Sequence, residues 1–406
     1  MLVASLAGLA ATLVLALADA LGLFGVAWGP AHQALGLAGA LLPALYALIH
    51  AVAGPRLSRP LEGAGLVAAL TMAGATLLAF QALLEGSVTS SAGLFLVVAL
   101  AFSGHLALLF GALLQMRSLR LAMPPRGTSL VDIARDPLTK GDDACLKQLK
   151  LGHIFLVVGL AAQTVLAWPF AGASSWMPGA RLAADHLLLV GFGLPVLFGV
   201  SHLLVPRLSG VPAIAAGAIK GELHSTLLGV TLLTAGFAFG IKGLTIAGGL
   251  VVFFAAFVWM GVLGANIMKN KSRTQRVTPG FAYIPWVFSG VLWIVVGVLL
   301  GLFLNIVPQV FADRLPALRS VHAHLLLFGG ALQLGLGLVA RAVRVEPVPF
   351  SLHRWSFFAL NVALGLLAWG FLTESPTARA QSAALGLLGL AAWFFPLVRR
   401  AAPVKA

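Results

Sequence analysis

Histidine is the residue type through which this chain could do chemistry, because the neutral imidazole ring is a good ligand for iron and copper. His322 and His324 form an H-x-H motif, while His32 and His186 each stand near the start of another long apolar segment. Side chains on facing helices of a bundle can build cofactor sites from such rings. A simpler alternative is that each ring only anchors the end of its helix.

The spacing within the H-x-H motif separates its two rings. Residues two apart on an α-helix point about 200° apart around the helix axis. His322 and His324 therefore cannot bind one metal together, but they can serve two cofactors on opposite sides of the helix. The pattern H-x-x-L-x-G recurs loosely at His32, His105, His186 and His324, and only the last two match it fully.

The other residues that could do chemistry are weaker candidates. Five histidines are predicted near the inner membrane face among Lys and Arg, where a structural role is favoured: His50, His153, His202, His224 and His353. An inner metal site or a proton path is the alternative, with His50, His153 and His202 the first to test. Acids are scarce, with Asp19 and Asp185 near outer helix ends and Glu222 near an inner one. Cys145 is predicted in a polar loop. Because it is the single cysteine of the chain, a disulfide framework and a C-x-x-C-H haem attachment site are excluded.

The composition is that of a polytopic membrane protein. Of the 406 residues, 60% are hydrophobic and 9% are charged, whereas about 25% are charged in an ordinary soluble domain. These values exclude a soluble enzyme, a nucleic-acid-binding protein and a disordered chain. The formal net charge of +14 comes from Lys and Arg in loops, as the positive-inside rule explains.

Apolar runs of about 20 residues predict an all-α fold of twelve transmembrane helices in a single domain, 1–406. The predicted spans are 2–24, 31–54, 62–84, 92–116, 151–170, 182–205, 222–240, 243–268, 282–308, 316–341, 353–373 and 379–398. The first run lacks a basic start and a clear cleavage site and is interpreted as a span, not a signal peptide. The longest connection is a polar cytoplasmic loop at about 117–150.

Basic residues orient these spans. Of the 26 Lys and Arg residues, all fall on one side except Arg181, Lys242, Arg314, Arg319 and Arg379. Both termini are therefore predicted to be cytoplasmic. This orientation places four histidines in the outer third of the membrane, namely His32, His186, His322 and His324, and His105 near its middle.

Three segments give the chain a resemblance to a known family. They read AHQALGLAGALLPALYALIHAVAGPRL, DHLLLVGFGLPVLFGVSHLLVPRLSG and VHAHLLLFGGALQLGLGLVARAV. With histidines at the outer start of span two, in span six and as H-x-H in span ten, the chain resembles subunit I of the haem-copper oxidase superfamily. The nearest members are the cbb3-type oxidases and the large subunits of nitric-oxide reductases.

The resemblance implies a role for each outer histidine. His32 and His324 would be the axial ligands of a low-spin haem b, and His322 the proximal ligand of a second haem. His186 matches the span-six ligand of the active-site copper or non-haem iron. Haem propionates point outward in such proteins, and the outer arginines Arg319 and Arg379 are candidate partners for them. The alternative is that these two arginines are ordinary loop residues.

One departure from the family changes these expectations. The family takes its other two copper ligands from a His-His pair near the outer end of span seven, where this chain reads LLTAGFAFGIKG. A single imidazole cannot hold copper in the usual three-nitrogen site. The cross-linking tyrosine of some oxidases is also missing, since the chain has only Tyr46 and Tyr283. Copper and the reduction of O2 to water are therefore not expected, and His186 is free to act as a distal ligand opposite His322.

The function implied by the resemblance is that of a membrane protein with one or two haems b. It would act in respiratory electron transfer or in the binding or reduction of a diatomic gas, NO or O2, and catalysis as an oxidoreductase is left open. The implied partners are membrane lipid and an electron donor, either a cytochrome c or cupredoxin-type subunit or quinol, in the cytoplasmic membrane of a prokaryote. Two alternatives are a twelve-span haem and copper protein of nitrosative stress and a transporter without haem.

Overall fold

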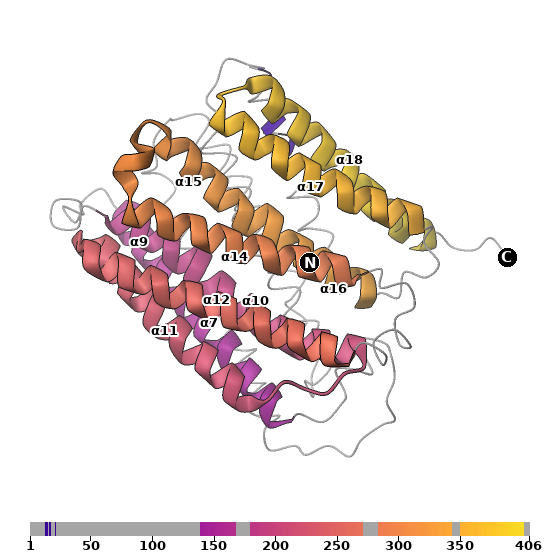
Figure 1. The fold of residues 1–406 in the computed structure, drawn as a ribbon, viewed down its shortest axis with the longest axis horizontal. Coiled ribbons are helices and arrows are strands. Elements are labelled where there is room, and N and C mark those ends of the chain that lie inside the picture. The colour runs from indigo at the N-terminus through magenta and orange to yellow at the C-terminus, as the bar shows by residue number, and fades with distance from the viewer. Residues whose placement is uncertain are drawn as a thin grey trace.

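The computed structural model describes residues 13, 14, 16, 17, 21, 139–167, 179–270, 283–342 and 350–401. In these ranges the chain is helical, without β-strands, and the helices pack into a bundle (Figure 1). Seven helical rods among them are long and apolar enough to cross a membrane, as expected of a multi-pass membrane protein. The predicted spans 2–24, 31–54, 62–84 and 92–116 lie outside the described residues, apart from a few positions of the first.

The described helices follow the other eight predicted spans. In chain order, α7 (Lys140–Ala167) is followed by one continuous rod formed by α9 (Ala180–His186), η4 (Leu187–Phe192) and α10 (Gly193–Ser209). Three single helices come next: α11 (Ala216–Phe239), α12 (Lys242–Lys269) and α14 (Ile284–Ile306). A second rod is formed by η5 (Pro308–Arg314), α15 (Leu315–His324), η6 (Leu325–Leu332) and α16 (Gln333–Ala342), and the last two described helices are α17 (Phe350–Leu372) and α18 (Pro376–Ala401). The ends of these helices lie within a few residues of the prediction, except at the starts of α7, α11 and the second rod, which begins at Pro308 and not at 316.

The polar loop predicted at about 117–150 ends earlier than predicted, because residues 140–150 are the first turns of α7. Two residues cap this helix reciprocally: the Asp142 N–H donates to the Thr139 hydroxyl at 3.2 Å, and the Thr139 N–H donates to the Asp142 carboxylate at 2.6 Å. Cys145 is therefore a buried residue of a helix and not a loop residue.

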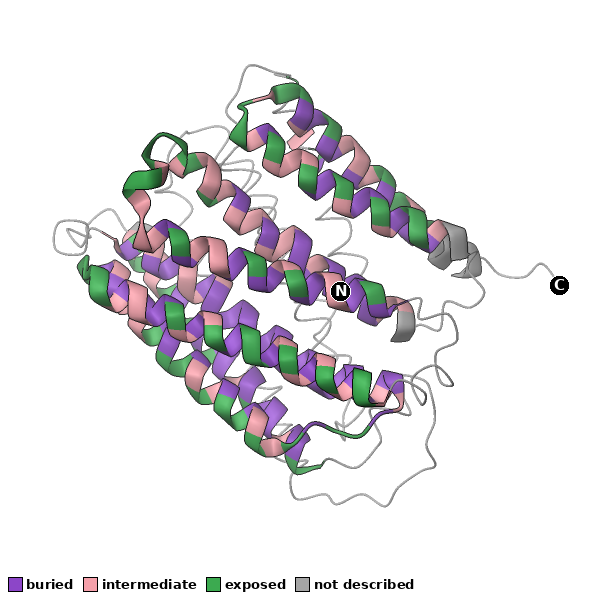
Figure 2. Cartoon of the chain, viewed as in Figure 1, coloured by how far each residue is buried: buried purple, intermediate pink, exposed green. Residues whose placement is uncertain are grey.

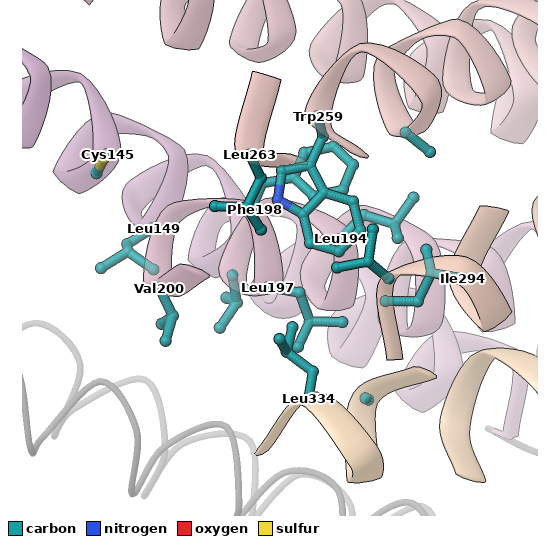
Figure 3. Packing of buried hydrophobic residues seen from close by; sticks show 14 of the residues in the cluster. Cys145, Leu149, Leu194, Leu197, Phe198, Val200, Trp259, Leu263, Ile294 and Leu334 are labelled. Carbon is teal, nitrogen blue, oxygen red and sulfur yellow. The ribbon is translucent and has the colours of Figure 1, made fainter. Parts of the chain in front are cut away.

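The rod formed by α9, η4 and α10 is the most deeply buried of the candidate spans. Its Phe198 stacks on Trp259 of α12 with ring centroids 4.6 Å apart, in the apolar core shown in Figure 3. The Trp259 indole N–H is satisfied by the hydroxyl of Ser201, at 2.8 Å. The outward faces of α12 and α17 are instead exposed (Figure 2). They carry large apolar side chains such as Phe254 and Trp369. Such a surface is suited to lipid hydrocarbon.

Helices α11 and α12 form a hairpin whose close approach depends on glycine. Gly240 closes the turn between them with a φ of 68°, in the left-handed region that favours glycine. A Cβ on Gly248 would overlap the backbone of Leu233, and one on Gly236 would overlap the backbone of Thr245. Small residues of this kind let membrane helices pack backbone to backbone. The hairpin fixes α11 in place, and both ends of α11 carry residues of the candidate sites.

Candidate functional site

Two described rods carry a predicted ligand histidine directly before a π-helix. His186 ends α9 and is followed by η4, and His324 ends α15 and is followed by η6. Both stretches have the sequence H-L-L-L-x-G, with Val or Phe at the variable position. Because π-helical turns inside helices occur frequently at functional sites, the local backbone marks both positions as candidates.

The ring of His322 is held against α14. Its Nδ1–H donates to the carbonyl oxygen of Gly297 at 2.7 Å. The ring also lies over Gly301, where a Cβ would be 2.5 Å from the Cε1 atom of His322. Gly301 therefore leaves the space that the imidazole occupies, about one helical turn from the carbonyl that orients it.

The ring of His324 contacts a different helix, α17. Its Nδ1–H donates to the carbonyl oxygen of Ser320 at 2.7 Å, and its ring centroid lies 5.4 Å from that of Phe371. His322 contacts α14 and His324 contacts α17, which confirms the prediction that the two rings leave the helix on different sides.

Arg379 lies beside the same phenyl ring. Its guanidinium carbon is 5.9 Å from the centroid of Phe371, so Phe371 contacts both His324 and Arg379. The Nε atom of Arg379 is buried and has no hydrogen-bond partner among the described residues. A buried guanidinium N–H without an acceptor is unfavourable, and an anionic group would satisfy it.

His186 lies within electrostatic range of His322. Its Nδ1–H donates to the carbonyl oxygen of Leu182 at 2.8 Å. His322 and Arg319 are both close enough to act on its ring electrostatically. The His186 ring also packs on Phe237 of α11, with centroids 4.5 Å apart. Phe237 belongs to the stretch LLTAGFAFGIKG, so a phenyl ring contacts His186 from the helix where the resembled family has its His-His pair.

The three outer histidines that the structure describes share one hydrogen-bonding arrangement. A backbone carbonyl oxygen can only accept, so Nδ1 must carry the proton in His186, His322 and His324. In a neutral ring, Nε2 then keeps its lone pair and is the nitrogen able to bind a metal. Histidines that ligate metals almost always donate their other ring N–H in this way. For His322 the acceptor lies on another helix, which makes the arrangement more specific than a bond within one helix.

The other predicted residues are placed as follows. His32, His50 and His105 lie outside the described residues. Within the described ranges, no group of three or more His, Cys, Asp or Glu side chains is arranged to hold a metal ion. Of the inner histidines, His153 donates its Nδ1–H to the Leu149 carbonyl and His224 is exposed.

Sequence reasoning missed two buried polar contacts at the other end of the bundle. His202 pairs with Glu222 at 2.7 Å, although the two residues lie on different helices, α10 and α11. Arg207 of α10 donates through both terminal nitrogens to the two carboxylate oxygens of Asp142 on α7, at 2.7 and 2.6 Å. The sequence did offer a signal for these contacts, namely an ionisable residue inside an apolar segment. A single sequence does not show, however, which side chains contact each other in the fold.

Comparison with protein-family models finds no match, and comparison with curated proteins finds no relative. These comparisons therefore assign the chain to no family.

The paired carboxylate of Asp142 allows a direct test of the packing between α7 and α10. Asp142→Asn should lower the free energy of unfolding by about 3–5 kcal/mol, because it leaves the largely buried Arg207 charge without its counter-ion. The neighbouring Asp143 has the same chemistry at the surface, where it pairs with Lys147 at 3.0 Å. Asp143→Asn should change the stability by less than about 1 kcal/mol. Unfolding of the two variants in detergent would be compared, and equal losses would contradict the assignment.

Proposed function

We propose that this protein is a b-type haem-binding membrane protein related to subunit I of the haem-copper oxidases. It would act in respiratory electron transfer or in the binding of a diatomic gas such as NO or O2. The observation that carries this proposal is the fixed orientation of His322, whose Nδ1 is tied to Gly297 of α14 and whose Nε2 keeps its lone pair. A structural histidine at a helix end would not need an acceptor on a neighbouring helix or the space left by Gly301.

Two haem sites are proposed from the arrangement of the rings. His322 would hold one haem through Nε2, and His186 is the candidate second residue at that haem. His324 would hold the other haem together with His32. When bound, a haem of this kind supplies one-electron transfer and, at an open coordination position, binding of a diatomic gas.

The outer arginines support the proposal through their positions. Arg379 is next to Phe371, which also contacts His324, and its buried Nε lacks an acceptor among the described residues. Arg319, in the middle of α15, is within electrostatic range of His186. The two guanidinium groups would therefore stabilise negatively charged propionates near the two proposed haems.

The environment of His186 favours electron transfer or gas binding over oxygen reduction. Copper in the superfamily needs two more imidazoles from span seven, and Phe237 packs on His186 from that helix instead. We therefore propose that His186 either faces an open position on the second haem or closes it. Electrons would come from a cytochrome c or cupredoxin-type subunit or from quinol, in the cytoplasmic membrane of a prokaryote.

Haem ligation by the outer histidines predicts which substitutions remove the low-spin signal. His324→Ala or His32→Ala should abolish the low-spin haem band in the optical spectrum of the purified protein, because each removes an axial ligand. His50→Ala should leave the band intact, since His50 lies about 27 Å further along the predicted helix at about 1.5 Å per residue. A wild-type protein without any Soret band would remove the haem proposal altogether.

The space at Gly301 gives a test that leaves every histidine in place. Gly301→Ala should alter the spectrum of the haem bound through His322, because a Cβ there would lie 2.5 Å from the ring. The low-spin band that depends on His324 should not change. Gly261→Ala is the matched control, since a Cβ at Gly261 would meet nothing within 4 Å. Identical spectra for the Gly301 and Gly261 variants would count against His322 as a ligand.

Carbon monoxide distinguishes an open haem from a closed one. If His186 leaves the sixth position open, CO should bind the reduced wild-type protein, and His322→Ala should remove that response. If His186 closes the position, CO binding should appear only in His186→Ala. Metal analysis of the same samples should find no stoichiometric copper. One copper per chain that is lost in His186→Ala would overturn this account of the site.

A further inference from the structure

A buried polar cluster joins α7, α10 and α11 at the end of the bundle away from His186. Nε2 of His202 lies 2.7 Å from Oε2 of Glu222, and neither side chain has any exposed surface. Gln148 of α7 reaches the same carboxyl oxygen at 3.4 Å through its side-chain amide. The cluster is about 24 Å from His186 along the continuous rod, at about 1.5 Å per residue.

Complete burial favours one shared proton for this pair. With one proton the pair is neutral overall, either as carboxylate and imidazolium or as carboxylic acid and imidazole. Loss of that proton would leave a lone buried carboxylate, and a second proton would leave a lone buried imidazolium. An uncompensated buried charge is strongly disfavoured, so the neutral pair with one shared proton is the favoured form.

Among the described residues, the groups around the pair do not supply another counter-ion. Asp142 of α7 is already paired with Arg207 of α10. The remaining groups are neutral or exposed: the buried thiol of Cys145 on α7, Lys220 and His224 on the surface of α11, and the indole of Trp259 on α12, which donates to Ser201.

The second polar atom of each side chain, on the side away from the shared hydrogen bond, lacks a partner among the described residues. Oε1 of Glu222 and Nδ1 of His202 are buried and have no hydrogen-bond partner in the part of the chain that the structure describes. Oε1 of Gln148, in the same cluster, is in the same situation. Buried polar atoms of this kind are normally satisfied by internal water, which can also donate or accept a proton.

We propose that Glu222 and His202 form an internal proton relay. In the neutral pair of carboxylic acid and imidazole, Oε1 of Glu222 takes a proton from water while the carboxyl group passes its Oε2 proton to Nε2 of His202 and Nδ1 releases its proton to water, so the pair never holds a second added proton. The pair is reset when the two side chains separate briefly, the carboxyl group turns over, and water carries the remaining ring proton from Nε2 to Nδ1. One proton enters and one leaves, and no oxidant or reductant takes part. The relay rests on these residues alone and does not require a haem.

Solvent exchange at the ring nitrogens tests this relay. The protein would be labelled with ¹⁵N in histidine only, reconstituted in lipid vesicles, and studied by solid-state NMR after transfer into D2O. The His202 signals would be assigned by their loss in His202→Gln. The Nδ1 proton of His202 should exchange at least about tenfold faster than the Nδ1 proton of His153, which is equally buried but donates to a backbone carbonyl.

Two variants separate a relay from a sealed structural pair. Glu222→Gln keeps the shape of the side chain but cannot carry a proton, so exchange at His202 should slow by at least about tenfold. Asp143→Asn removes an exposed acid of α7 and should leave exchange unchanged. Exchange in the wild type as slow at His202 as at His153 would overturn the relay, and so would fast exchange that persists in Glu222→Gln. The wild-type comparison with His153 decides the question even where Glu222→Gln fails to fold.

Discussion

Inside a membrane, each polar group must find its partner within the protein, because lipid hydrocarbon offers no hydrogen bond. The buried rod of α9, η4 and α10 shows the consequence most clearly. His186 at one end donates to its own backbone and packs on Phe237, while His202 and Arg207 at the other end meet carboxylates of neighbouring helices. The positions of α7 and α11 around this rod are therefore tied to a few polar contacts as well as to apolar packing.

Glycine makes several of these contacts possible. Gly301 leaves room for the His322 ring, and Gly297, one turn away, offers the carbonyl oxygen that orients it. Gly248 and Gly236 bring the backbones of α11 and α12 together in the same manner. The use of small residues in this chain thus serves close helix packing at one place and the shape of a candidate cofactor site at another.

The sequence was sufficient for features that depend on length, apolarity and helical period. It predicted the described spans to within a few residues at most ends, and it predicted that His322 and His324 face different sides of one helix. It failed where a partner far along the chain decides the outcome. Residues 140–150 looked like a loop because they are polar, yet Asp142 is buried by its contact with Arg207, 65 positions later.

The same distinction holds for the candidate site: features set by nearby residues could be predicted, and contacts with residues far along the chain could not. The identity of the outer histidines could be predicted from residue type and depth, but their acceptors could not. Gly297 is 25 positions from His322, and Phe371 belongs to another helix than His324. The π-helices after His186 and His324 had a local signal, the repeated H-L-L-L-x-G, but a regular helix fits that pattern as well.

Along the rod of α9, η4 and α10 and along α11, an apolar stretch separates the two polar ends. Between His186 and His202, the rod contains no other titratable residue, and residues such as Phe198 and Val200 are fully buried there. On α11, the hydroxyls of Thr226, Thr231 and Thr234 all donate to carbonyls of their own helix, so they are not available to link Glu222 with the far end. The proposed relay at His202 and the proposed haem site at His322 would therefore have no polar connection through these two helices. Loss of either proposed function by substitution should then leave the other in place.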